Sequence, residues 1–204
     1  TLDAAWRQHD NPPAPPAQHV PLPAETVLRQ AIRVPLVLCF SHDDYAVSCG
    51  GVQNVIAAEQ RGFAAEGIGY MHLAPVAPRL TLAEPDPEAR YLVRLDGKAL
   101  GVAAMPDLLR VCQDLAARSG VLAGVVHHLS GHAPEQVQAL LQAAGVERPL
   151  FWLHDFGSLC GNPALLRNDV VFCAAPAPET GACMVCAHGA ARPGHIARVQ
   201  ALFE

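Results

Sequence analysis

Apolar positions follow two different periods along the chain. Short continuous apolar runs rich in β-branched residues predict strands, and the first of them, VPLVLCF, has the composition of a strand buried on both faces. The runs predicted as strands are 34–40, 68–73, 121–127 and 149–154. Apolar residues spaced at i, i+3 and i+4 predict amphipathic helices between and after these runs. The segments predicted as helices are 52–66, 106–119, 134–144 and 196–203.

Strands that alternate with helices of this length indicate βαβ units. The sequence therefore predicts a Rossmann-like α/β fold, in which helices cover both faces of a mostly parallel sheet. A hairpin is expected within it, because Asp96-Gly97 lies between the apolar segments 91–95 and 99–103 and is a strong hairpin signal.

The two ends of the chain differ in composition from this α/β region. Six prolines lie within the first 23 residues, so residues 1–33 are predicted to form a proline-rich arm or linker and residues 34–204 the folded domain. Regular spacing is lost after residue 155, and residues 156–190 are interpreted as a cysteine-rich insertion. A loop of this length within a compact domain needs something that holds it in place.

Composition and charge exclude several classes of protein. Apolar residues make up 51% of the chain and charged residues 16%, which excludes a disordered protein. Lys and Arg (14) are outnumbered by Asp and Glu (19) and form no basic block, so nucleic acid is not expected as a partner. No apolar run reaches membrane-spanning length, and the first residues do not resemble a signal peptide. We expect a cytoplasmic protein, at most peripherally associated with the inner face of the membrane.

A diglycine turn follows the first predicted strand. Gly50 and Gly51 let the backbone approach a ligand closely, and the helix that starts there offers free N–H groups to an anion. In an open α/β sheet this turn lies at the carboxyl end of a strand, where ligands bind. The turn matches neither the dinucleotide fingerprint nor the phosphate-binding loop, so no NAD or flavin is expected. The alternative is a tight turn that binds nothing.

Histidines end two further predicted strands. His127-His128 closes one of them and His154-Asp155 follows another, at the same edge of the sheet as the glycine turn. Imidazole titrates near pH 7 and forms hydrogen bonds with hydroxyl and phosphate groups. Each pair alone is consistent with structural histidines, but their convergence predicts a binding site at this edge.

Two other features have less weight. The segment His42-Asp43-Asp44 also follows a strand, but an acidic turn there is typically only solvated. The chain contains neither the G-x-S-x-G nucleophile motif nor the H-E-x-x-H zinc motif.

Four of the seven cysteines lie close together in the sequence. Cys160, Cys173, Cys183 and Cys186 form the pattern C-x12-C-x9-C-x2-C, and four thiolates of this kind are able to surround a structural zinc ion that holds the loop. His188 or His195 is able to replace one sulfur. The alternatives are disulfides, four free thiols, or a redox pair formed by the last two cysteines.

Three segments carry a resemblance to a known family. They are the glycine turn GGVQ at 50–53, the strand that runs to HLAP at 72–75, and FWLHDFGSLCGNPALLRNDVVFCAAPAPETGACMVC at 151–186. Over residues 34–204 the chain resembles the N-terminal half of GT-B retaining glycosyltransferases of family 4, in a cysteine-containing branch.

The resemblance implies a function for this edge of the sheet. An N-terminal domain of this kind shapes the acceptor side of a cleft, and a C-terminal GT-B domain outside this chain holds most of the nucleotide-sugar donor. By the same resemblance, Gly50, Gly51, Gln53 and His128 bind substrate or donor, and His154 and Asp155 are the catalytic residues. Retaining transfer in this fold is thought to use donor phosphate and oriented backbone groups instead of a protein nucleophile.

The hypothesis is therefore half of a transferase that moves a sugar from a nucleotide-sugar to a glycan or lipid-linked acceptor in polysaccharide synthesis. On its own this segment is expected to be inactive. The alternative is a non-catalytic α/β binding or scaffold module stabilised by zinc.

Overall fold

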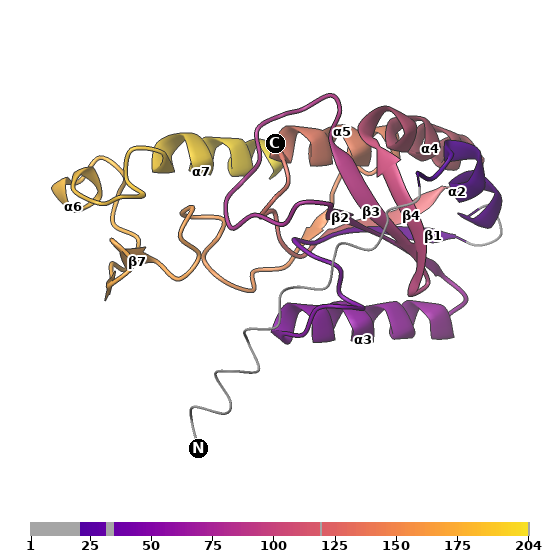
Figure 1. Cartoon of the computed structure of the whole chain (residues 1–204), viewed down its shortest axis with the longest axis horizontal. Coiled ribbons are helices and arrows are strands. Elements are labelled where there is room, and N and C mark those ends of the chain that lie inside the picture. The colour runs from indigo at the N-terminus through magenta and orange to yellow at the C-terminus, as the bar shows by residue number, and fades with distance from the viewer. Residues whose placement is uncertain (1–20, 32–34, 119, 204) are drawn as a thin grey trace, which may run out of the picture.

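The computed structural model describes residues 21–31, 35–118 and 120–203, which form a three-layer α/β domain (Figure 1). Its six-stranded sheet has the order β4-β3-β2-β1-β5-β6. The neighbours β2, β1, β5 and β6 are parallel, and β3 is antiparallel to both β2 and β4. The predicted α/β class with a mostly parallel sheet is confirmed.

The elements lie close to the ranges that the apolar pattern predicts. The strands of the sheet are β1 Leu36–Phe40, β2 Gly69–Pro75, β3 Arg90–Leu95, β4 Lys98–Ala104, β5 Val121–Val126 and β6 Leu150–Phe151. The longer helices are α2 Ala24–Ala31, α3 Gly51–Ala65, α4 Met105–Arg118, α5 Pro134–Ala143 and α7 Arg192–Gln200, and α7 continues into the 3-10 helix η1 Ala201–Phe203. The predicted hairpin is formed by β3 and β4, with Asp96 and Gly97 at positive φ.

Strand β1 is buried on both faces, and its side chains divide between two cores. Leu36, Leu38 and Phe40 pack into the larger core, which α2, α4, α5 and α7 cover. Val37 and Cys39 pack on the opposite face, under α3. Figure 1 shows α3 on one side of the sheet and α2, α4 and α5 on the other. Residues at odd and even positions of a strand point to opposite faces, which is why a central parallel strand is apolar throughout.

Two predicted boundaries are wrong. Residues 21–31 were expected to belong to the proline-rich arm, yet they form part of the domain: α2 packs on α4, and Leu22 N–H donates to Val102 O at 2.8 Å. Val27 and Ala31 are fully buried, so apolar burial outweighs the effect of the flanking prolines. The remainder of the predicted arm, residues 1–20 and 32–33, and Val34 of the first predicted strand lie outside the described residues.

The strand predicted over 149–154 is also shorter than expected. Strand β6 comprises only Leu150 and Phe151, at the edge of the sheet, where it pairs with β5 alone. After Trp152 N–H donates to Val126 O at 2.9 Å, the chain leaves the sheet. An edge strand pairs with a neighbour on one side only. Beyond β6, the side chain of Trp152 contacts Glu59 and that of His154 contacts His127.

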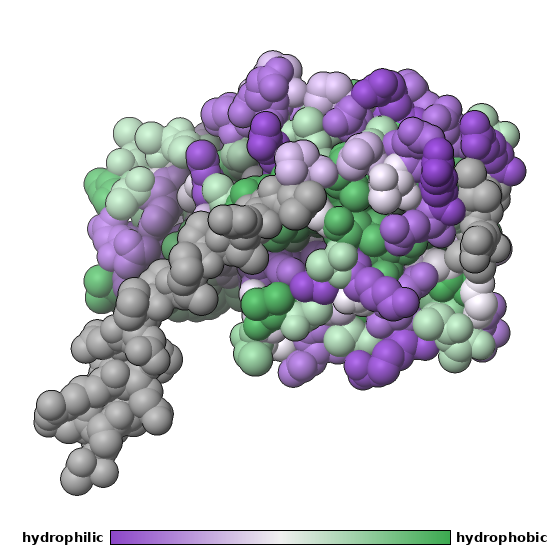
Figure 2. Space-filling view, turned by 45° about the vertical axis from the view of Figure 1, so that its right-hand side comes forward, coloured by the Kyte–Doolittle hydropathy of each residue, from purple (hydrophilic) through white to green (hydrophobic). Residues whose placement is uncertain are grey.

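The segment 156–190 contains only short elements. They are β7 Leu166–Arg167, β8 Val171–Phe172 and α6 Gly181–Met184, which lie at the far left of Figure 1. Figure 2 shows apolar surface at that end of the molecule. The large apolar side chains exposed in this segment are Phe156, Leu159, Val170, Val171, Phe172, Met184 and Val185. Within the described part of the chain, every helix is too short or too polar to cross a bilayer.

Candidate functional site

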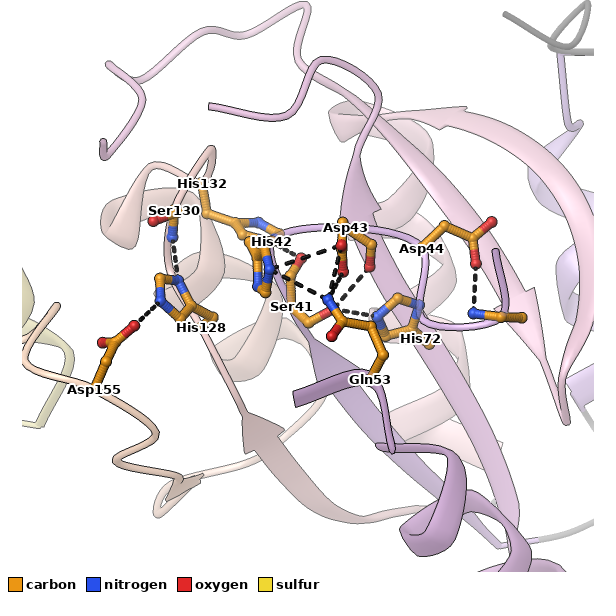
Figure 3. Close-up of polar contacts among 11 residues, drawn as sticks. Ser41, His42, Asp43, Asp44, Gln53, His72, His128, Ser130, His132 and Asp155 are labelled. Carbon is orange, nitrogen blue, oxygen red and sulfur yellow. Dashed lines mark hydrogen bonds and ion pairs between the residues drawn. The ribbon is translucent and has the colours of Figure 1, made fainter. Parts of the chain in front are cut away.

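The strand order reverses next to β1, and this places the candidate site. From β1 the chain runs outward through β2, β3 and β4, then returns to form β5 on the other side of β1. Ligands of open α/β sheets bind at such a switch point, at the carboxyl ends of the strands. The carboxyl ends of β1, β5 and β6 carry His42, His128 and Asp155, and Gln53 reaches the same place from α3 (Figure 3).

The first turn of α3 is open toward this edge. Gly50 is the N-cap of this helix of 15 residues, and no side chain caps it. Gly51 is exposed, and a Cβ built on it meets nothing within 4 Å. A Cβ on Gly50 would lie 2.3 Å from Oε1 of Gln53. Any larger residue at this position would therefore force the Gln53 side chain to move. The uncapped N–H groups and the helix dipole form a favourable environment for an anion.

Gln53, Asp43 and His42 form a small network beside that turn. Nε2 of Gln53 donates to both carboxylate oxygens of Asp43, at 2.8 Å each, and lies 3.4 Å from Nε2 of His42. Nδ1 of His42 is buried, and no group in the described residues forms a hydrogen bond with it. Burial lowers the pKa of His42, although Asp43 acts in the opposite direction. His42 is therefore a neutral imidazole with a free nitrogen.

His128 and Asp155 form a pair whose hydrogen bonds are all satisfied. Nδ1 of His128 accepts from the backbone N–H of Ser130 at 3.1 Å, so Nε2 carries the hydrogen and donates to Oδ2 of Asp155 at 2.8 Å. The other carboxylate oxygen accepts from Gly157 N–H at 2.7 Å. Burial would raise the pKa of Asp155, but the hydrogen bonds from His128 and Gly157 outweigh it and the pKa is lowered. Both ring nitrogens of His128 are thus occupied, and the pair fixes the shape of the edge.

The ring of His128 also stands against that of His42, with centroids 4.7 Å apart. This contact connects the network of α3 and β1 to the pair at the ends of β5 and β6. The structure therefore brings together Gly50, Gly51, Gln53, His128 and Asp155, which the sequence places at one edge.

His154 belongs to a second chain of contacts just beside this one. Its Nε2 lies 2.9 Å from Nδ1 of the fully buried His127, whose Nε2 lies 3.0 Å from Oε2 of Glu59 on α3. The ring of Trp152 is nearly parallel to both imidazoles. Burial lowers the pKa of His154, and the neighbouring His127 and His128 lower it further. His154 is consequently neutral at pH 7 and only partly buried.

Ser41 and His72 have the spacing of a nucleophile and its base, but they do not form one. Oγ of Ser41 lies 2.6 Å from Nε2 of His72, and both residues are buried. The hydroxyl of Ser41 donates to Asp43 O at 2.9 Å, so His72 is the donor in the pair. Burial lowers the pKa of His72 to about 3, which makes it a poor base. This pair holds the β1 turn in place.

A small pocket opens on the other side of the His128–Asp155 pair. Leu82, Trp152, Cys160 and His195 are among the residues that line it, together with His128 and Asp155. Nε2 of His195 donates to Gly157 O at 2.6 Å and so ties α7 to the loop after β6. The pocket gives this edge of the sheet a concave surface beside the His128–Asp155 pair.

The four cysteines predicted to bind zinc form no disulfide bond with one another in the structure. Cys160 and Cys183 are buried, and Cys173 and Cys186 are partly exposed. Across residues 21–31, 35–118 and 120–203, no three His, Cys, Asp or Glu side chains are grouped closely enough to hold a metal ion. Cys183 instead accepts a hydrogen bond at 2.9 Å from the guanidinium of Arg192, which is itself buried. In this arrangement the cysteines do not fit a tetrahedral zinc site.

The zinc site stays a prediction. Binding of zinc by all four cysteines would require their sulfur atoms to lie closer together than they do in this structure. If it holds, purified protein carries one zinc per chain, and a chelator lowers the melting temperature and makes all four thiols reactive. These quantities are measured by metal analysis, calorimetry and thiol titration. Protein purified without zinc, whose thiols react from the start, would contradict the prediction.

Sequence reasoning gave little weight to His42 and Asp43 and did not select Glu59 or His127 as a pair. The position of His42 and Asp43 directly after a buried strand is the signal that finds them. Glu59 lies three residues after the buried Ile56, on the side of α3 that faces the sheet. A single carboxylate on the apolar face of a helix needs a hydrogen-bond donor from the sheet that this face covers. This is the sequence feature that could have identified Glu59.

Searches of protein-family models, curated proteins and solved structures find no match to this chain.

Proposed function

We propose that this chain is the acceptor-side, N-terminal half of a retaining GT-B glycosyltransferase. The full protein transfers a sugar from a nucleotide-sugar to a glycan or lipid-linked acceptor. The observation that carries the proposal is the convergence, at the switch point of the sheet, of an uncapped helix N-terminus with neutral imidazoles. The helix N-terminus suits a diphosphate, and the imidazoles suit sugar hydroxyls.

Each part of the edge has a role in this proposal. The diphosphate of the donor lies against Gly50 and Gly51, where the free N–H groups of α3 stabilise the charge that develops as the glycosidic bond breaks. His154 forms a hydrogen bond with a hydroxyl of the transferred sugar. The His128–Asp155 pair holds the loop that shapes the acceptor side.

The proposed mechanism does not require a nucleophile from the enzyme. The buried Ser41–His72 pair does not supply one, because His72 is the donor in that hydrogen bond. Transfer then depends on the donor phosphate and on positioned groups, which need no covalent enzyme intermediate.

Turnover by the full-length protein tests the proposal. Each common nucleotide-sugar is supplied in turn, with free glycans and lipid-linked acceptors, and release of the nucleoside diphosphate is measured. We expect release with one donor and retention of the anomeric configuration in the product. No release with any donor would contradict the proposal and favour a binding or scaffold module.

Replacing His154 with alanine is expected to lower kcat about 100-fold, because a polar contact positioned for the transition state is lost. The chain should remain folded, since His154 is only partly buried. The matched control is His188→Ala, which removes another partly exposed imidazole that contacts an aspartate, Asp169, at 2.9 Å. Equal activity of both variants and the wild type would show that His154 does not contact the reacting sugar.

A further inference from the structure

Glu59 is a partly buried acceptor that three donors from different elements surround. Oε2 of Glu59 accepts from Tyr70 at 2.7 Å and faces Nε2 of His127 at 3.0 Å, while Oε1 accepts from Nε1 of Trp152 at 3.1 Å. Burial alone would raise the pKa of Glu59, but these hydrogen bonds outweigh it and the pKa is lowered. Glu59 is therefore a carboxylate, and a carboxylate only accepts hydrogen bonds.

This acceptor determines which nitrogens of the two imidazoles carry hydrogen. Nε2 of His127 faces the carboxylate, so it must be N–H. When the ring carries hydrogen on Nε2 alone, Nδ1 of His127 is an acceptor, and Nε2 of His154 donates to it across 2.9 Å. Nδ1 of His154 is left without a hydrogen. No hydrogen bond to that atom is formed anywhere in the described parts of the chain.

We propose that Glu59 is a positioning residue that acts through His127 to make His154 present a hydrogen-bond acceptor at the site. The inference rests on the proposed function for the identity of its ligand. It adds a reason why the sugar and the diphosphate of the donor bind at different places. An acceptor nitrogen suits a hydroxyl group, which donates, and repels phosphate oxygens. The sugar therefore lies at His154, and the diphosphate lies at the first turn of α3.

The geometry around Glu59 explains why an amide cannot replace the acid. In Glu59→Gln all three contacts are kept only if the amide oxygen lies opposite Trp152, whose indole nitrogen is only a donor, and the amide nitrogen lies opposite Tyr70, whose hydroxyl is able to accept. The amide N–H₂ then faces His127, which has to accept on Nε2 and carry its hydrogen on Nδ1. His154 in turn has to carry its hydrogen on Nδ1, and the free acceptor is lost. One substitution on α3 thus changes Nδ1 of His154 from a hydrogen-bond acceptor to a donor.

The tautomers are measured by ¹⁵N NMR of the histidine-labelled 204-residue chain at pH 8, where an ordinary histidine is neutral. We expect both His127 and His154 to carry hydrogen on Nε2 in the wild type and on Nδ1 in Glu59→Gln. Glu66→Gln, which changes an exposed glutamate just after the same helix, should leave both unchanged. Signals are assigned with His127→Gln and His154→Gln.

The wild-type spectrum decides the matter even if Glu59→Gln fails to fold. A hydrogen on Nδ1 of His154, or a doubly protonated His127, in the wild type would overturn the proposal. Unchanged tautomers in folded Glu59→Gln would do the same. None of these measurements needs a substrate, so they remain valid if the proposed transferase activity is not found.

If the full-length protein is active, donors that lack one sugar hydroxyl test the ligand assignment. At the position that His154 contacts, the deoxy donor should be about tenfold poorer for the wild type, as expected for one lost hydrogen bond. The same donor should be less than about twofold poorer for Glu59→Gln, which has already lost the acceptor. Equal discrimination by both proteins at every position would overturn the assignment of His154 to a hydroxyl.

Discussion

Lowering the pH from 7 to 5 is expected to remove about 4 kcal/mol from the free energy of unfolding of this domain. The loss arises from two fully buried histidines near the site. Burial lowers the pKa of His72 to about 3 and that of His132 to about 4, from an ordinary value of 6.5. A domain of this size has a total stability of about 5–15 kcal/mol, so the change is a large fraction of it.

The direction follows from which state binds the protons. Above pH 6.5 these histidines are neutral in both the folded and the unfolded chain, and stability does not depend on them. Below pH 6.5 the unfolded chain binds protons that the folded chain excludes, so each histidine removes about 1.4 kcal/mol per pH unit. The loss ends near pH 4 for His132 and near pH 3 for His72, where the folded state also binds the proton.

The structure shows why the folded state excludes these protons. Nε2 of His132 donates to Ser41 O at 2.7 Å, and its buried Nδ1 has no partner among the described residues. A proton on Nδ1 would be an unsatisfied buried charge. Partly buried His42, His154 and His195 also have lowered pKa values and act in the same direction.

Urea unfolding at pH 5, 6, 7 and 8 measures the effect. His72→Gln should lower the stability at every pH but also reduce the slope of stability against pH, by about 1.4 kcal/mol per unit. His188→Gln is the control, because His188 lies outside this buried cluster and contacts Asp169 instead. A stability that is constant between pH 7 and pH 5 would contradict the buried neutral state of both histidines.

Replacing Gly51 with valine is expected to abolish sugar transfer by the full-length protein while the domain stays folded. A Cβ at this position meets no protein atom within 4 Å, so the added side chain occupies the open space in front of the first turn of α3. That space is where the proposed function places the donor diphosphate. We expect kcat/KM to fall at least about 1,000-fold, because the phosphate loses the free N–H groups that stabilise it.

The matched control is Gly62→Val in the same helix. Gly62 is also exposed, and a Cβ there also meets nothing within 4 Å, but it lies far from the first turn. Both variants should unfold within about 1 kcal/mol of the wild type, since valine has a higher helix propensity than glycine. Wild-type activity of folded Gly51→Val would show that the donor does not bind at this turn.

Much of the fold is predictable from the sequence because its signals are local. The apolar run of β1, the helical spacing of α4 and α5, and the Asp96-Gly97 turn each depend on residues a few positions apart. The same local signals place Gly50-Gly51, His127-His128 and His154-Asp155 at the ends of strands. In a parallel sheet those ends meet at one edge, so the location of the candidate site is also predictable.

The local sequence pattern gave wrong boundaries where packing between segments distant in the sequence decides the structure. The prolines around residues 12–23 suggested an arm that continues to residue 33, but α2 is held by its packing on α4. Strand β6 ends at Phe151, and the indole nitrogen of the next residue, Trp152, donates to Glu59 of α3. Neither contact has a signature in the sequence around it.

The amino-acid sequence by itself determined the α/β class, the order of elements and the edge at which histidines and glycines gather, since these follow from periodicity and from strand direction. Only the tertiary structure decided which atoms of that edge face each other. Glu59 and His127 are 68 residues apart, and Glu59 and Trp152 are 93 apart. Their hydrogen bonds depend on how α3 packs on the sheet and on the register of β5 and β6, and a tautomer follows from such a contact, not from the identity of a neighbouring residue.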